Sequence, residues 1–169
     1  MGNLLFSPSG RIGPAAFMKG MLVLAAISAA LSFLPFISVG LAMIVGILSL
    51  VLYVPLVFLG IKRSHDAGRS GWFSIVLVLI TWGVGFVLGL LLLPMFMGSA
   101  MDTAAIEAAS ETGDMSAVFD AAGEMAKKTA IPSAIASLVS FAVSAFIFNA
   151  INKSDPGDNQ YGPATLGDS

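Results

Sequence analysis

Four long apolar runs alternate with short polar segments along this chain. Each run reaches the length of about 20 residues that a helix needs to cross about 30 Å of hydrocarbon. In lipid only a helix or a closed barrel satisfies every backbone polar group, and the runs lack the short alternating pattern of barrel strands. The pattern therefore predicts an all-α integral membrane four-helix bundle, one domain over residues 1–169, with spans at residues 15–34, 38–61, 72–97 and 132–151.

The longest polar segment, residues 98–131, separates the third and fourth runs. Within it, residues 114–128 carry apolar side chains at helical spacing, which predicts an extra amphipathic helical segment with Asp114 as its N-cap. The Ala-rich residues 102–110 favour another short helix. We expect a helical lid packed over the bundle, with a partner-binding site or a largely disordered loop as alternatives. The tail, residues 152–169, is rich in turn-forming residues.

Composition agrees with a membrane protein, because only 11% of the residues are charged against about 25% in soluble domains. The chain has no Cys, which excludes disulfides, thiolate metal sites and thiol nucleophiles. Its single His argues against a structural zinc site. We expect no cofactor and no metal. We also expect no nucleic-acid partner, because the basic residues are spread over separate segments without interleaved aromatics.

The distribution of Lys and Arg predicts the orientation of the spans, because cytoplasmic loops carry an excess of both. With the N-terminus inside, four spans return the C-terminus to the same side. The inside segments then hold Arg11, Lys19, Lys62, Arg63, Arg69 and Lys153, and the outside loop holds only Lys127 and Lys128. Both termini are therefore expected in the cytoplasm. The first apolar run continues well beyond the length of a signal-peptide core, so we interpret it as an uncleaved span.

Small residues recur at helical spacing on the last two spans. Gly85 and Gly89 form a G-x-x-x-G on the third, and Ala136, Ser140 and Ser144 follow at intervals of four on the fourth. Such faces allow helix backbones to approach closely. We expect them to pack the bundle internally. Homo-oligomerisation through the same faces is the alternative.

Three polar motifs flank the spans, and the predicted topology places all three on the inside. They are Gly-Arg-Ile-Gly-Pro at residues 10–14, Lys-Arg-Ser-His-Asp-Ala-Gly-Arg-Ser-Gly-Trp at residues 62–72, and Asp-Pro-Gly-Asp-Asn-Gln-Tyr-Gly-Pro at residues 155–163. Their sequence and order resemble a family of small multi-pass bacterial inner-membrane proteins known as domain of unknown function 805. The resemblance implies a bacterial inner-membrane location but no established activity.

Three departures from the family pattern are visible. Lys62 stands where the family has Arg, and the first motif continues with Pro14, two alanines and Phe17 in place of charged residues and an aromatic. The acidic insert is also longer than the family pattern implies, so any role for it has no family support. The loop and tail motifs otherwise match in residue type, order and placement.

The candidate cytoplasmic-face site consists of Arg11, Arg63, His65, Asp66, Gly68, Arg69, Ser70, Trp72, Asp155, Asn159 and Tyr161. We expect Gly68 to adopt positive φ in a turn and Ser70 to cap the third span. Trp72 fits an interfacial anchor and Tyr161 a tail anchor.

Three functions are consistent with these residues. The first is a non-catalytic scaffold or accessory protein, in which Arg63 and Arg69 pair with Asp66, Asp155 or Asp158. Such an Arg–Asp clamp would lock loop to tail. The second is binding of an anionic lipid or phosphate by Arg11, Lys62, Arg63 and Arg69, in a transport accessory for example. The third is a membrane enzyme with His65 as base and Ser64 or Ser70 as nucleophile. We favour the first. Membrane lipids and an unidentified protein are the expected partners.

Overall fold

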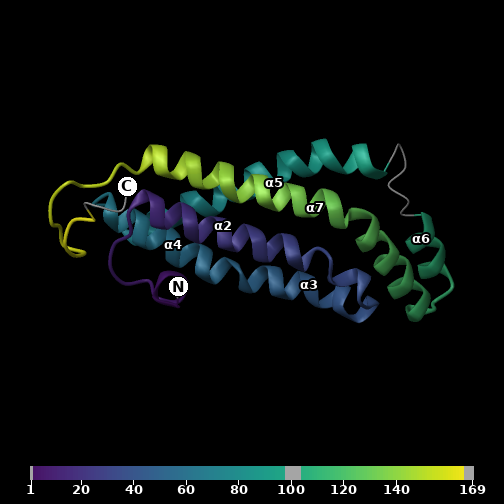
Figure 1. Ribbon diagram of the computed structural model, residues 1–169. Coiled ribbons are helices and arrows are strands. Elements are labelled where there is room, and N and C mark those ends of the chain that lie inside the picture. The colour runs from purple at the N-terminus through teal and green to yellow at the C-terminus, as the bar shows by residue number, and fades with distance from the viewer. Residues whose placement is uncertain (1, 98–103, 166–169) are drawn as a thin grey trace.

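The computed structural model describes residues 2–97 and 104–165, and it forms a bundle of long helices (Figure 1). Within these ranges the chain is all-α, since the only strand-like pairing is an isolated bridge between Asn159 and Gly162. The elements in chain order are α1 (Gly2–Phe6), α2 (Pro14–Leu31), η1 (Leu34–Phe36), α3 (Val39–Val51), α4 (Tyr53–Asp66), η2 (Gly71–Phe73), α5 (Ser74–Met97), α6 (Ala104–Glu111) and α7 (Met115–Ile151).

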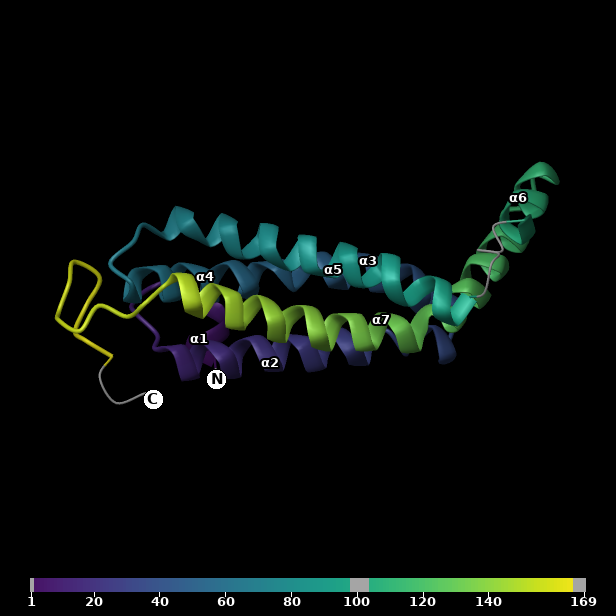
Figure 2. The same ribbon diagram turned by 90° about the horizontal axis from the view of Figure 1, so that it is seen from above.

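Four segments are long and apolar enough to cross a membrane, which confirms the predicted fold class. They are Pro14–Phe36, Ile44–Asp66, Gly71–Leu92 and Met115–Ile151. The N-terminal helix α1 and the C-terminal tail lie at one end of the bundle, and α6 lies at the other (Figure 2). The three polar motifs thus meet at a single end of the molecule. We call residues 10–14, 63–72 and 155–165 the loop-and-tail face.

Helix α7 is the centre of the packing, because it lies against both α2 and α5, and α5 also packs on α4. Phe17 and Phe148 lie in contact, with ring centroids 5.6 Å apart, and Phe73 contacts Phe148 at 6.0 Å. Such contacts hold a membrane bundle by close van der Waals packing, since lipid tails are as apolar as the side chains. The buried core comprises Leu5, Ile12, Phe17, Met21, Leu24, Leu56, Leu59, Leu77, Ala145 and Phe148.

Small residues bring α5 close to its neighbours. A Cβ placed on Gly60 of α4 would stand 2.9 Å from Ser74 Cβ, so a glycine is needed there. Gly85 faces Ser140 of α7, whose hydroxyl donates to the carbonyl of Thr81 at 3.0 Å. Gly85 and Ser140 thus take part in packing within one chain. Homo-oligomerisation through these faces stays a prediction.

The second span is interrupted once and extends further than predicted. Pro55 has no N–H to donate to the carbonyl of Val51, and its ring would clash with that carbonyl in a regular helix. The helix accordingly divides between α3 and α4 at Leu52. We expected the second span to end at Ile61, but α4 continues to Asp66. The charged residues 62–66 are therefore helical and not part of a loop.

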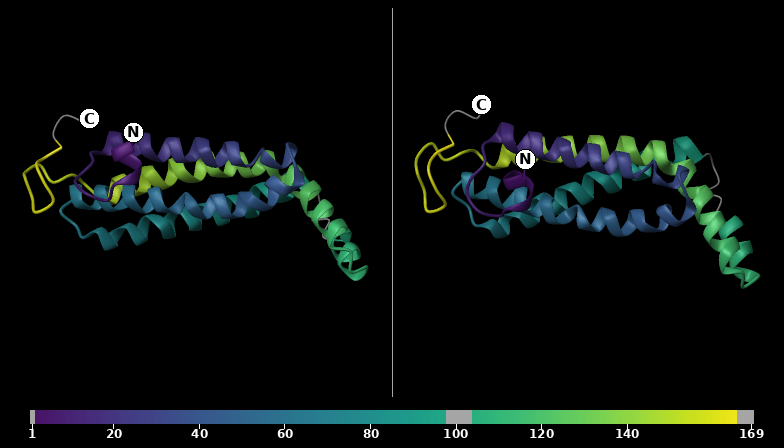
Figure 3. Two further views of the ribbon diagram at one scale, coloured as in Figure 1. Left: turned by 90° about the horizontal axis from the view of Figure 1, so that it is seen from below. Right: turned by 60° about the horizontal axis from the view of Figure 1, so that its bottom comes forward.

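The polar insert differs from the predicted lid. Asp114 caps α7 by accepting from the backbone N–H groups of Ser116 and Ala117, as predicted. However, the amphipathic segment and the fourth span form one continuous helix of 37 residues, with Pro132 inside it. Helix α6 pairs with the first turns of α7, and together they project from the bundle end (Figure 3). Asp102, at the start of the predicted short helix, lies outside the described residues.

Candidate functional site

The site begins with the way α4 ends. The Arg69 N–H donates to the Ser64 carbonyl at 2.9 Å and the Gly68 N–H donates to the His65 carbonyl at 3.1 Å. Gly68 has φ +68, a left-handed value that suits glycine. This is the Schellman pattern of helix termination, and it confirms the predicted positive φ. The chain thereby reverses immediately after Asp66, which leaves that carboxylate at the end of the helix.

Asp66 is the centre of the loop-and-tail face. Its side chain is fully buried, yet it is ionisable and must be compensated. Oδ1 lies 3.2 Å from Nη2 of Arg11, and Oδ2 lies 2.5 Å from Nη1 of Arg63. Oδ1 also accepts from the Thr165 hydroxyl at 2.5 Å. One carboxylate thus joins the N-terminal loop, the end of α4 and the tail.

Arg11 fastens the tail to this carboxylate. Besides Asp66, its guanidinium donates to three tail carbonyls, those of Asp155 at 2.9 Å, Gly157 at 2.8 Å and Gly162 at 3.1 Å. The side chain is only 1% exposed. Its planar fork of donors suits this purpose, since a lysine would supply a single point charge. Arg11 is therefore fully occupied within the chain.

Arg63 fastens the end of α7 in the same way. Its Nε donates to Asn149 Oδ1 at 2.7 Å, and its Nη1 donates to the Ser154 hydroxyl at 3.1 Å. Its Nη2 donates to the carbonyl of Asn152. The Arg63 side chain is 2% exposed. The two arginines thus hold opposite sides of one carboxylate, and each reaches a different part of the C-terminal region.

Lys62 performs a related role at the N-terminus. Its ammonium donates to the carbonyls of Asn3 at 2.7 Å and of Leu4. These carbonyls belong to α1, which packs against α4. The lysine is 2% exposed. Three of the four basic residues predicted to bind an anion are thus buried and bound to groups of the chain itself.

The tail forms a tight turn that rests on α4. The Asp155 N–H donates to the Asp66 carbonyl at 2.8 Å, and the Asn159 side chain donates to the His65 carbonyl at 3.1 Å. Asn159 also accepts from the Tyr161 N–H at 2.9 Å, and its backbone pairs with Gly162. The turn therefore places the Tyr161 ring beside α4.

His65 and Tyr161 stack face to face, with ring centroids 3.8 Å apart and an interplanar angle of 4°. His65 Nδ1 lies 3.2 Å from the Gly10 carbonyl oxygen, an acceptor, so Nδ1 carries the proton. Nε2 makes no hydrogen bond within residues 2–97 and 104–165. The Ser64 hydroxyl donates to the Gly60 carbonyl at 2.7 Å and points back along its own helix.

Arg69, Ser70 and Trp72 lie at the edge of the face and outside the Asp66 cluster. The Arg69 guanidinium lies 4.4 Å from the centroid of the Phe73 ring, a cation–π contact, and the residue is exposed. The Ser70 hydroxyl accepts from the Trp72 N–H at 3.5 Å and so begins η2, as predicted for a cap. Trp72 is 80% exposed.

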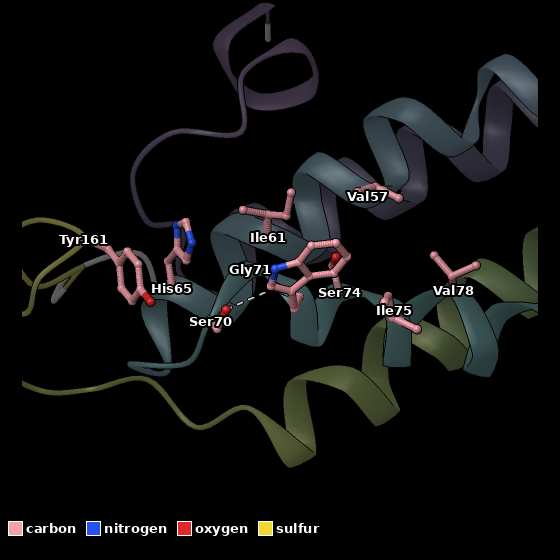
Figure 4. A pocket seen from close by; sticks show the side chains of 10 residues that line it. Val57, Ile61, His65, Ser70, Gly71, Ser74, Ile75, Val78 and Tyr161 are labelled. Atoms are coloured by element: carbon pink, nitrogen blue, oxygen red, sulfur yellow. Dashed lines mark hydrogen bonds between the residues drawn. The ribbon is translucent and has the colours of Figure 1, made fainter.

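A groove of about 480 Å³ runs beside this edge between α4 and α5 (Figure 4). His65, Ser70 and Tyr161 form its polar end, and Trp72 also lines it. Gly71 forms part of the wall, where a Cβ would stand 3.1 Å from Ile61 and 3.3 Å from His65 Nε2. The remaining lining is mostly apolar and comes from Val57, Ile61, Ile75 and Val78.

The structure brings most of the candidate residues together, and it adds others. The Asp66 cluster joins Arg11 and Arg63 to the tail, and Asn159 and Tyr161 rest on His65. The sequence predicted Asp66, Asp155 or Asp158 as the acidic partners of the clamp, and Asp66 takes this role with Arg63. The tail instead contributes mainly backbone carbonyls, which bind Arg11. The sequence did not single out four further residues of the site, which are Asn149, Asn152, Ser154 and Thr165. Their only sequence signal was that they are polar residues at or beyond the end of the last span. No cluster of three or more metal-binding side chains occurs among the described residues.

Comparison with known proteins gives one result. Residues 5–163 match the family model described as Protein of unknown function (DUF805). No curated protein and no solved structure shows significant similarity to the chain. The matched segment covers nearly all of the sequence and includes all three polar motifs, so this membrane protein belongs to the family of unknown function DUF805.

Proposed function

We propose that this protein is a non-catalytic scaffold or accessory protein of the bacterial inner membrane, with both termini in the cytoplasm. The observation that carries the proposal is the Asp66 cluster. A fully buried carboxylate held by two buried arginines fixes the N-terminal loop and the tail against α4. Such an arrangement builds a rigid surface, since Arg11, Arg63 and Asp66 already have their partners within the chain.

The geometry around His65 supports a structural role over a catalytic one. A general base requires a nucleophile within hydrogen-bond reach and usually a third group to orient it. The orienting contact of His65 is a backbone carbonyl, and the ring is covered by Tyr161. The neighbouring Ser64 hydroxyl is bonded to Gly60. We therefore rank a membrane enzyme below a scaffold.

A crosslinking experiment in cells tests the scaffold. A photoreactive amino acid is placed at exposed Gln160 in the tail, and at exposed Met115 as a control at the other end of the molecule. We expect a discrete adduct with another protein from Gln160 only. The same probe is then combined with Arg11→Gln, which removes the bonds from the guanidinium to the tail and should abolish that adduct. Absence of an adduct at Gln160, or an adduct unchanged by Arg11→Gln, would contradict a scaffold built on the locked tail.

Binding of an anionic lipid or phosphate at the same face is a second candidate. One observation favours it. Arg69 is exposed and has no salt bridge within residues 2–97 and 104–165, unlike Arg11 and Arg63. A phosphate group would complement such a guanidinium.

A further inference from the structure

We infer that the groove between α4 and α5 binds one anionic phospholipid, with its headgroup at His65, Ser70 and Tyr161 and an acyl chain along Val57, Ile61, Ile75 and Val78. The inference deepens the second candidate function by naming the ligand and its position. It does not depend on the scaffold. The volume of the groove, about 480 Å³, lies within the range of about 300–1,000 Å³ that is typical of ligand sites.

The lining of the groove changes from polar to apolar along its length. The polar end belongs to the loop-and-tail face, where His65 Nε2 and the Tyr161 hydroxyl have no hydrogen-bond partner within the described residues (Figure 4). The apolar part lies on α4 and α5, inside the segments Ile44–Asp66 and Gly71–Leu92 that can cross a membrane. A ligand that fills the groove must therefore be amphiphilic and must enter the hydrocarbon layer.

The groove opens toward the part of the surface that faces lipid. Trp72 is 80% exposed, and Ile75 and Leu79 are 50% and 62% exposed on the following turns of α5. An exposed Trp beside a row of exposed aliphatic residues is typical of the boundary between headgroups and hydrocarbon. A bilayer lipid can reach this groove sideways, without passing through water.

We expect Arg69, the residue before Ser70 in the chain, to favour an anionic headgroup. Ser70 lines the groove, and the Arg69 guanidinium is held over Phe73. Among the described residues its charge has no acidic partner, so a phosphate or phosphatidylglycerol headgroup would supply one. Ser70 and Tyr161 each carry a hydroxyl that can donate to phosphate oxygens. The anionic site is thus expected at Arg69 and not at Arg11, Lys62 or Arg63, which are bonded internally.

Native mass spectrometry of delipidated protein tests the site with phosphatidylglycerol and phosphatidylcholine of identical chains. We expect one phosphatidylglycerol retained on the wild type, with weaker retention of phosphatidylcholine. Val57→Trp fills the apolar groove and should lower retention about tenfold. Val54→Trp is the matched control, since it makes the same change one turn away on exposed surface outside the groove. Arg69→Gln should equalise the two lipids.

Two further measurements keep the test decisive. Inorganic phosphate in excess should not displace the lipid, and displacement would indicate a phosphate site without a lipid chain. A phosphatidylglycerol with a photoreactive acyl chain should label residues 57–61 and 75–78 of the wild type. This labelling uses only the wild type, so its outcome does not depend on whether a variant folds. Equal retention by Val57→Trp and wild type, or labelling spread evenly over α2 and α5, would overturn the inference. Neither result bears on the adduct at Gln160, so the scaffold and the lipid site fail separately.

Discussion

The four basic residues predicted to bind an anion differ in whether their charges are available to a ligand. Arg11, Lys62, Arg63 and Arg69 look alike as a basic cluster. The side chains of the first three are buried and bonded within the chain, and only Arg69 is exposed. A buried cation is retained only if its partners compensate its lost hydration, so burial separates structural from accessible basic residues.

Asp66→Asn should be far more destabilising than Asp155→Asn. Asp66→Asn removes the charge that compensates Arg11 and Arg63, and breaking a buried ion pair costs about 3–5 kcal/mol of unfolding free energy. Asp155 contacts Arg11 through its backbone carbonyl, which the variant keeps, and its carboxylate bonds only groups of the tail. The loss there should be about 0.5–1.5 kcal/mol. Thermal unfolding in one detergent compares the two. Similar melting temperatures would show that Asp66 is not the centre of the lock.

At the element scale, helix contacts depend on where a side chain can be accommodated. Gly60→Ala would place a methyl 2.9 Å from Ser74 Cβ and 3.3 Å from Ser74 Cα, and that backbone cannot move aside easily. We expect a loss of about 1–3 kcal/mol, as in other overpacked sites. Gly46→Ala is the control, since nothing lies within 4 Å of the added Cβ. There the better helix propensity should raise stability by up to about 1 kcal/mol. Chemical denaturation in mixed micelles measures both, and a neutral Gly60→Ala would refute close contact between α4 and α5.

The N-terminus of α7 should fray in acid. The Ser116 hydroxyl and then the Ala117 and Ser116 N–H groups bond to Asp114 and lower its carboxyl pKa. Because the folded-state pKa is depressed, the cap stabilises the helix fully above the ordinary Asp range. This contribution is lost as pH falls through the depressed pKa. Amide exchange over residues 115–119 should therefore gain an extra acid-dependent opening that Asp114→Asn lacks. An identical pH profile in both proteins would exclude a charged cap.

The sequence predicted the elements better than their boundaries. Apolar length is sufficient to predict four spans, and Asp114 caps the helix that it was predicted to begin. The division at Leu52 depends on Pro55, which the apolar pattern does not register. Residues 62–66 look like a loop because they are charged. They remain helical because each charge finds a partner. Lys62 reaches α1, Arg63 reaches α7, and Asp66 binds Arg11. Only the Arg63–Asp66 pair, at i,i+3 on one helix, is local enough to be read from the sequence.

The location of the candidate site was predictable from the sequence, but most of its individual contacts were not. Three motifs on one side of the predicted membrane implied that Arg11, Asp66 and the tail lie near one another. The pairing of Arg63 with Asp66 was among the predicted contacts. The tail partners of Arg11 were not predictable, because they are backbone carbonyls and these have no sequence signature. The groove also has no motif, since Val57 and Val78 become neighbours only when α4 and α5 pack.

At the scale of the whole molecule, the two ends differ in chemistry. One end carries both terminal segments and the locked, basic loop-and-tail face. The other carries the helical hairpin of α6 and α7 (Figure 2). Glu107, Glu111 and Asp114 of this hairpin are exposed. Six of the eight Lys and Arg residues lie in the segments at the first end. Such asymmetry favours retention of the basic end in the cytoplasm during insertion.

Cysteine labelling tests this orientation. The chain has no Cys of its own, so any label on this protein comes from the introduced thiol. Gln160→Cys and Glu111→Cys place one thiol at each end, and both positions are exposed. With a membrane-impermeant maleimide added to intact spheroplasts, Glu111→Cys should label at once and Gln160→Cys only after permeabilisation. The opposite result would invert the topology. The loop-and-tail face would then meet the periplasm, and the cytoplasmic scaffold would be refuted.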